Sequence, residues 1–162
     1  MWPIGIRSSI ITLLLIITYG LMLSMGLLKY VGSNHLGHVI FGLGIYSGHY
    51  YYKRAYEGRL RYREAVQVGL IIVGITAGTI ASLSYCIAKF VDPLLVSHTI
   101  EHVNSTLQQS HVDASRAETI IPALVSYLTP AGFALSIALT ILIPGIILNL
   151  VIAVFSAGFA KK

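Results

Sequence analysis

The sequence is poor in charge, in cysteine and in acidic side chains. Asp, Glu, Lys and Arg together make up 10% of its 162 residues, whereas soluble domains carry roughly 25%. So few charges exclude an ordinary soluble domain, which places its charged residues at a water-facing surface. The single cysteine, Cys86, has no partner within the chain. No intramolecular disulfide holds the fold, which therefore depends on packing.

The sequence is rich in long apolar runs. Hydrophobic residues make up 56% of the chain and the mean hydropathy is +0.79, as is typical of an integral membrane protein. Four runs approach the roughly 20 residues that cross a hydrocarbon core. We therefore predict one all-α membrane domain over residues 1–162, with four transmembrane helices in a four-helix bundle, at about 8–28, 36–52, 65–90 and 131–160. Residues 92–129 are predicted to form an amphipathic helical segment between the third and fourth spans.

Basic residues are concentrated between the second and third runs, where five of the eleven lie: Lys53, Arg54, Arg59, Arg61 and Arg63. Lys and Arg beside a membrane span stay on the cytoplasmic side. With both termini cytoplasmic, eight basic residues lie inside and three outside, so we predict this topology. It also accounts for the net charge of +5, and nucleic acid is not a predicted partner. The alternative interpretation of the five residues is contact with anionic lipid headgroups.

Small residues recur at four-residue spacing within the predicted spans. On a membrane helix this spacing places them on one face, where they let a neighbouring helix approach closely. Asn149 belongs to such a series and is expected to bond to a neighbouring helix rather than face lipid. The predicted helix-packing residues are Gly44, Gly48, Gly74, Gly78, Ser82, Gly145 and Asn149.

One motif suggests metal chemistry. The sequence from His98 through Glu101 to His102 has the H-x-x-E-H form, in which two histidines hold zinc and the glutamate activates water. Zinc needs a third protein ligand, and the candidates nearby are His111, Asp113 and Glu118. A solvated helix face is the better interpretation. His98 and His102 remain as metal candidates, and a zinc-dependent membrane hydrolase is the weakest of the functional alternatives.

Three histidines share a face of the second predicted span. On a helix of 3.6 residues per turn, His35, His38 and His49 fall within about 40° of one another. Ionisable groups inside a membrane are candidates for a proton or metal path. The competing interpretation is a neutral histidine bonded to a neighbouring helix, because no buried carboxylate accompanies the three.

The basic segment carries a family resemblance. The pattern Tyr52-Lys53-Arg54, followed by Gly58-Arg59-Leu60-Arg61-Tyr62-Arg63-Glu64-Ala65 and Gly69, resembles domain of unknown function 4199, a Bacteroidetes family of small four-span proteins. Asp92-Pro93 matches the proline that follows the third span in that family. Arg61 departs from the small hydroxyl residue common there, and the segment after span three is richer in histidine. The resemblance implies this architecture and a bacterial inner membrane, but the family has no established activity.

Taken together, these features predict a non-enzymatic inner-membrane protein without a cofactor. Its expected partners are membrane lipids and either further copies of itself or a larger membrane complex. The main alternative is a small transporter or a protein that handles lipid phosphates. A water-filled cavity lined by His38, Asn149 or the loop arginines would favour the alternative, whereas a closed core would favour assembly.

Overall fold

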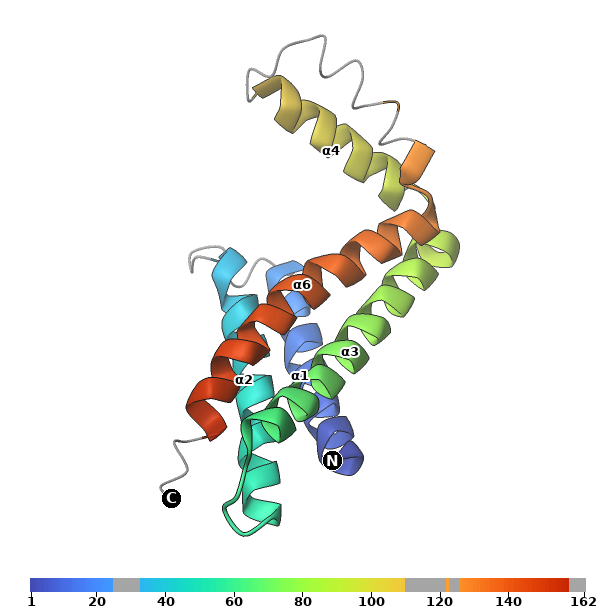
Figure 1. The fold of residues 1–162 in the computed structure, drawn as a ribbon. Coiled ribbons are helices and arrows are strands. Elements are labelled where there is room, and N and C mark those ends of the chain that lie inside the picture. The colour runs from blue at the N-terminus through green and yellow to red at the C-terminus, as the bar shows by residue number, and fades with distance from the viewer. Residues whose placement is uncertain (25–32, 110–121, 123–125, 158–162) are drawn as a thin grey trace. The chain divides into compact units, whose positions relative to one another are not determined.

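The computed structural model describes residues 1–24, 33–109, 122 and 126–157. The described chain is helical nearly throughout and contains no strand, as predicted. Its elements are α1 (Trp2–Ser24), α2 (Ser33–Ala55), α3 (Tyr62–Cys86), a turn of π-helix η1 (Ile87–Val91), α4 (Leu95–Gln109) and α6 (Pro130–Ala157) (Figure 1).

Three helical stretches among the described residues are long and apolar enough to cross a membrane. They cover Trp2–Met22, Tyr62–Val91 and Pro130–Ala157. Four were predicted, and the second predicted run, α2, does not meet these criteria of length and hydropathy. The physical reason is composition, because α2 has the length of a span but carries repeated glycine, histidine and serine in place of aliphatic residues.

The helix boundaries extend the predicted ones at several ends. α1 begins at Trp2 rather than at Ser8, because a charged Arg7 does not interrupt a helix even where it would end an apolar run. At the end of η1, the Asp92 N–H donates to the Ile87 oxygen over 2.8 Å, five residues back, and Pro93 follows. α4 forms part of the predicted segment at 92–129, most of whose remainder lies outside the described residues.

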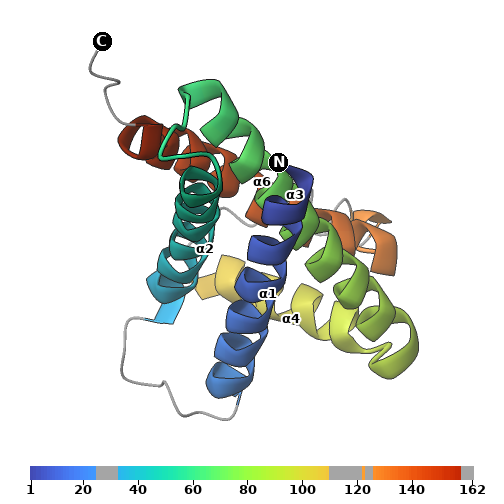
Figure 2. The ribbon, with the colours of Figure 1, turned by 90° about the horizontal axis from the view of Figure 1, so that it is seen from below.

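The chain divides into two compact units. The first comprises Met1–Ala77 with Ile141–Lys162, and the second is Gly78–Thr140, so α3 and α6 each contribute to both. In the first unit, α1 and α2 lie side by side (Figures 1 and 2). The core residues of this unit come mainly from α2 and α3, with one from α6: Phe41, Ile45, Tyr52, Leu60, Ala65, Val68, Ile72, Val73 and Ala153.

The inner face of α1 is built from small residues. Ser9 and Thr12 are fully buried, and their hydroxyls donate to the Gly5 and Ser8 carbonyls of the same helix at 2.7 and 2.8 Å. Their hydrogen-bonding needs are thus met within α1. A Cβ added at Gly5 would lie only 2.7 Å from the Ile71 side chain of α3. α1 therefore approaches its neighbours closely, as membrane helices with small interfacial residues do.

In the second unit, α4 turns its apolar side inward. Val96 is buried, while His98, Glu101 and His102 are exposed. This is the amphipathic pattern predicted for these positions. The start of α6 is capped by Thr129, whose side-chain oxygen accepts the Gly132 N–H over 3.1 Å.

Candidate functional site

The basic segment folds as a tight connection between α2 and α3. At the end of α2 the Gly58 N–H donates to the Lys53 oxygen over 2.8 Å. This six-to-one bond is the Schellman ending, in which the residue after the helix takes a left-handed conformation. Glu57 occupies that position with φ of 51°, and Gly58 follows with φ of 78°. A glutamate thus stands where glycine is the usual residue.

The start of α3 is fixed by Glu64. Its Oε2 accepts the Arg61 backbone N–H over 2.9 Å. A glutamate at the third helical position that bonds back to the capping residue forms one half of a capping box. The connection is therefore held at both ends by hydrogen bonds that depend on the local sequence.

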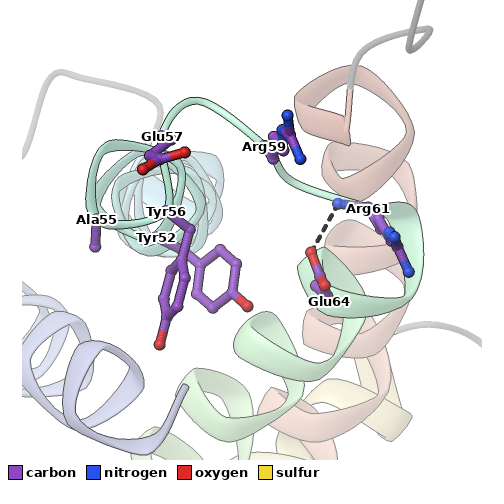
Figure 3. Close-up of a pocket in the computed structure, with 7 residues that line it drawn as sticks. All are labelled: Tyr52, Ala55, Tyr56, Glu57, Arg59, Arg61 and Glu64. Carbon is purple, nitrogen blue, oxygen red and sulfur yellow. Dashed lines mark hydrogen bonds between the residues drawn. The ribbon is translucent and has the colours of Figure 1, made fainter. Parts of the chain in front are cut away.

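A pocket of about 420 Å³ lies at this connection (Figure 3). Tyr52 and Tyr56 stack on one another inside it, with ring centroids 4.4 Å apart and an interplanar angle of 26°. Tyr52 is nearly buried, with 4% of its surface exposed, whereas Tyr56 is half exposed. The full lining is Tyr52, Ala55, Tyr56, Glu57, Arg59, Arg61 and Glu64.

The pocket combines charges of both signs. Glu57 and Glu64 both line it, and they are the only acidic residues in the sequence of the first unit. Arg59 and Arg61 are exposed, and Figure 3 shows their guanidinium groups at the edge, away from the two tyrosines. The lining therefore has mixed charge beside two stacked tyrosines, with Glu57 exposed like the two arginines and Glu64 half-buried.

All five basic residues predicted to contact lipid are exposed. They are the two arginines of the pocket together with Lys53, Arg54 and Arg63. The guanidinium carbon of Arg7 in α1 lies 5.6 Å from the centre of the Tyr51 ring in α2. This cation–π contact adds a sixth basic residue to the same end of the first unit.

Two polar side chains of the first unit are bonded across its core. Asn149 of α6 donates through Nδ2 to the Val66 oxygen of α3 over 3.0 Å. His49 Nδ1 of α2 and Ser156 Oγ of α6 lie 3.0 Å apart, with the donor set by the histidine tautomer. Asn149 is 0% and His49 1% exposed. Both residues thus join helices within the first unit.

Glycine makes room for these contacts. A Cβ at Gly69 of α3 would overlap the Asn149 carboxamide. A cavity of about 110 Å³ adjoins the His49 and Ser156 pair, with Lys53 in its lining. The core around Asn149 is closed, whereas the space beside His49 is large enough for water.

The predicted helix-packing positions fall into two groups. A Cβ at Gly44 would overlap Thr12 of α1, one at Gly48 would overlap Ile72 of α3, and one at Gly145 would lie 2.6 Å from the Phe41 ring. Gly74 and Gly78 differ, because nothing in the described structure lies within 4 Å of a Cβ added there. The hydroxyl of Ser82 donates to the Gly78 oxygen over 2.8 Å, within its own helix.

The predicted metal residues are exposed on α4. His98 and His102 lie on its surface with Glu101 between them, and no group of three or more metal-ligating side chains occurs among the residues described. The possible third ligands at 111, 113 and 118 lie outside the described residues. The described part of α4 therefore provides no further support for the H-x-x-E-H motif as a metal site.

The histidines on the predicted shared face of α2 lie in different environments. His38 is exposed and His49 is buried against Ser156. The side chain of His35 lies outside the described residues.

Several residues of these sites were not found from the sequence. Glu57 and Glu64 were read only as members of the charged segment, and Ser156 and Gly69 were assigned no contact. The only local signal was the position of Glu64 three residues after Arg61, which matches the glutamate half of a capping box. The pairing of His49 with Ser156 spans 107 residues of sequence and has no local signal.

Fold and site together define a class: a helical protein whose described residues include three helices able to cross a membrane and a basic, tyrosine-lined connection in the first unit. Comparison with family models places the chain more narrowly. The model for proteins of unknown function DUF4199 matches residues 4–157, so the chain belongs to this family. No curated protein and no solved structure matches the chain.

Proposed function

We propose that this chain is a non-enzymatic protein of the bacterial inner membrane that packs with further copies of itself through α3. Both termini and the basic connection lie on the cytoplasmic side in this proposal, as the positive-inside rule requires. α2 crosses the membrane beside α1 although it is the less apolar helix, because Gly44 packs against Thr12 and Arg7 lies near Tyr51 along their shared length.

The observation that carries the proposal is the open glycine face of α3. Gly74 and Gly78 lie in a helix apolar enough to cross a membrane, yet nothing in the described chain lies within 4 Å of a Cβ added at either glycine. Exposed glycines let a second helix come close, and lipid chains gain little there. The glycines of the core have partners, and the closed packing around Asn149 also favours assembly over transport.

In a dimer formed through α3, the shared orientation of the two copies in the membrane determines which residues lie opposite one another. All copies of a membrane protein share one orientation, so a two-fold axis between two copies runs along the membrane normal. Each residue of the face then lies opposite its own counterpart, Gly78 against Gly78 and Ser82 near Ser82. This symmetry makes cross-linking between identical positions the direct test.

The experiment uses Ser82→Cys in a Cys86→Ala background, oxidised in native membranes. We expect a disulfide-linked dimer, and we expect Gly78→Leu to abolish it because a leucine side chain holds the helices apart. Gly20→Leu is the matched control, since Gly20 of α1 is also exposed with nothing described within 4 Å of an added Cβ. Equal dimer yields from the two leucine variants would count against the proposal. A cross-link to a different protein would favour an accessory subunit instead.

A second candidate function is lipid-phosphate handling at the α2–α3 connection. It is favoured by the exposed basic residues around the 420 Å³ pocket, which include Arg59 and Arg61. Each basic residue near a membrane surface contributes about 1 kcal/mol of attraction to anionic lipid. Replacing Arg59 and Arg63 by glutamine should therefore weaken enrichment of phosphate-bearing lipids around the purified protein, and an unchanged lipid content would speak against this candidate.

A further inference from the structure

We infer that a groove between the end of α3 and the start of α6 binds one phospholipid, with an acyl chain in the groove and the lipid phosphate on Lys89. The inference goes beyond the proposed self-association, and it requires only that α3 and α6 cross the membrane. The lipid belongs to the leaflet opposite the α2–α3 connection.

The groove lies within the second unit and has a volume of about 400 Å³. It forms where the last turns of α3 lie beside the first turns of α6 (Figure 1). Both helices contribute apolar walls, and no charged residue is among the described residues that line it; the apolar ones are Ala81, Ala131, Ala134 and Leu135. Because both helices are apolar enough to cross a membrane, the groove is suited to an acyl chain.

The lengths of the two helices place the end of the groove at the level of lipid headgroups. α3 and η1 form one apolar stretch of 30 residues that begins at Tyr62, beside the α2–α3 connection. At 1.5 Å per residue this stretch is about 45 Å long, close to the roughly 40–45 Å of a bilayer with its headgroup regions. When the connection lies in one headgroup layer, Lys89 near the other end of the stretch therefore reaches the opposite layer.

Lys89 supplies a cation at the end of the groove. Its Nζ donates to the Tyr85 hydroxyl over 3.0 Å and lies 5.3 Å from the ring centres of both Tyr85 and Phe90. Because Tyr85 lines the groove, these contacts hold the ammonium beside it. Lys89 is exposed, and an ammonium has three N–H donors. Two donors therefore remain for the oxygens of a phosphate.

The lining of the groove favours an acyl chain over a helix from a second copy. Close packing of membrane helices needs small residues over successive turns, as Gly74 and Gly78 provide earlier in α3. The groove begins beyond these glycines, where Tyr85 and Leu135 add bulk to the lining. A flexible chain fills such an irregular space, whereas a helix backbone is held away. Ser82 is common to both surfaces, so the lipid lies at the edge of the proposed contact between copies.

The experiment places the full chain in nanodiscs that contain a trace of one of two photoreactive lipids. Both carry the same diazirine-bearing acyl chains, but one is a phosphatidylglycerol and the other is a diacylglycerol, which has no phosphate. Labelled peptides are counted by mass spectrometry. We expect the phosphatidylglycerol to label residues 81–86 and 131–135 about tenfold more than the diacylglycerol does, as for one added hydrogen bond between charged groups.

Variants at Lys89 separate headgroup recognition from the fold. Lys89→Gln should remove the tenfold difference between the two probes, and Lys89→Arg should retain it, because a guanidinium also binds phosphate. Lys53→Gln is the matched control, since Lys53 is likewise exposed but lies in the last turn of α2. Both lysines are on the surface, so neither substitution should unfold the chain.

Each other outcome overturns the inference in a distinguishable way. Equal labelling of the groove and of the exposed side of α1 by both probes would indicate surrounding bulk lipid only. Strong labelling of the groove by both probes, unchanged in Lys89→Gln, would remove the phosphate contact. An unlabelled groove beside a labelled α1 would exclude lipid, and a Cys86 disulfide between two copies would then assign the groove to self-association. Absence of label from all helices would contradict membrane insertion, and with it the proposed function.

Discussion

Asn149 and Gly69 form the most specific contact of the first unit at the scale of single residues. The carboxamide of Asn149 occupies the space that a side chain at residue 69 would need, and it bonds to the Val66 oxygen. Hydrogen bonds between membrane helices average only about 0.6 kcal/mol. Steric fit at Gly69 therefore matters more than the hydrogen bond itself.

Because steric fit at Gly69 outweighs the Asn149 hydrogen bond, we predict different losses of stability for variants at the two positions. Asn149→Ala should lower the free energy of unfolding by about 1 kcal/mol, whereas Gly69→Ala should cost about 2–3 kcal/mol because it overpacks a closed core. The double variant should be more stable than Gly69→Ala alone, since the smaller side chain at 149 leaves room for the new methyl group. Thermal unfolding in detergent measures all three.

Gly74→Ala serves as the control for these variants. It lies on the same helix in open space, so alanine there should be neutral or stabilising through its higher helix propensity. A Gly69→Ala variant as stable as Gly74→Ala would show that the close contact with Asn149 is absent.

At this scale the sequence predicted the kind of contact but not the partners. Asn149 was expected to bond to another helix, and it does. The partner is a backbone carbonyl 83 residues away, which no local pattern indicates. Gly74 remains a predicted packing residue, but spacing alone does not show whether the chain itself covers a glycine or leaves it open, as it does Gly74.

Among the helices, α4 contains the H-x-x-E-H motif, and its side chains allow the metal-site interpretation to be tested. Its apolar residue Val96 is buried, while His98, Glu101 and His102 are exposed. We predict that replacing each of the three by alanine changes the free energy of unfolding by less than about 0.5 kcal/mol, as is usual for exposed positions. We also predict that the purified chain contains no stoichiometric zinc.

The contrary outcome for α4 is equally specific. A zinc site loses metal and stability together when one ligand is removed. One zinc per chain by elemental analysis, lost on His102→Ala, would make α4 part of a metal centre. Ser105→Ala, on the same exposed surface of α4, provides the control.

The elements were more predictable than their roles. Runs of apolar residues gave α1, α3 and α6 to within a few residues at most ends, since helix length in a membrane is set by hydrocarbon thickness. α2 was also found, but its glycines and histidines leave it short of the composition of a span. Its packing depends on Thr12 and Ile72 of other helices, which its own sequence does not reveal.

On the scale of the whole molecule, the proposed orientation depends on where the basic residues of the first unit lie. Arg7 lies near Tyr51, and the basic connection follows directly after α2. The basic residues of the first unit described here therefore gather at one end, which the positive-inside rule assigns to the cytoplasm. The proposals on self-association and on lipid binding both depend on this orientation.

The most direct measurement is the accessibility of single cysteines in intact cells. Gly58→Cys and Ser105→Cys, each in a Cys86→Ala background, are treated with a thiol reagent that does not cross the inner membrane. We predict labelling at position 105 and none at position 58 until the membrane is permeabilised. Labelling at position 58 but not at 105 in intact cells would contradict this orientation, because the basic connection would then lie outside the cytoplasm and the positive-inside assignment would be reversed.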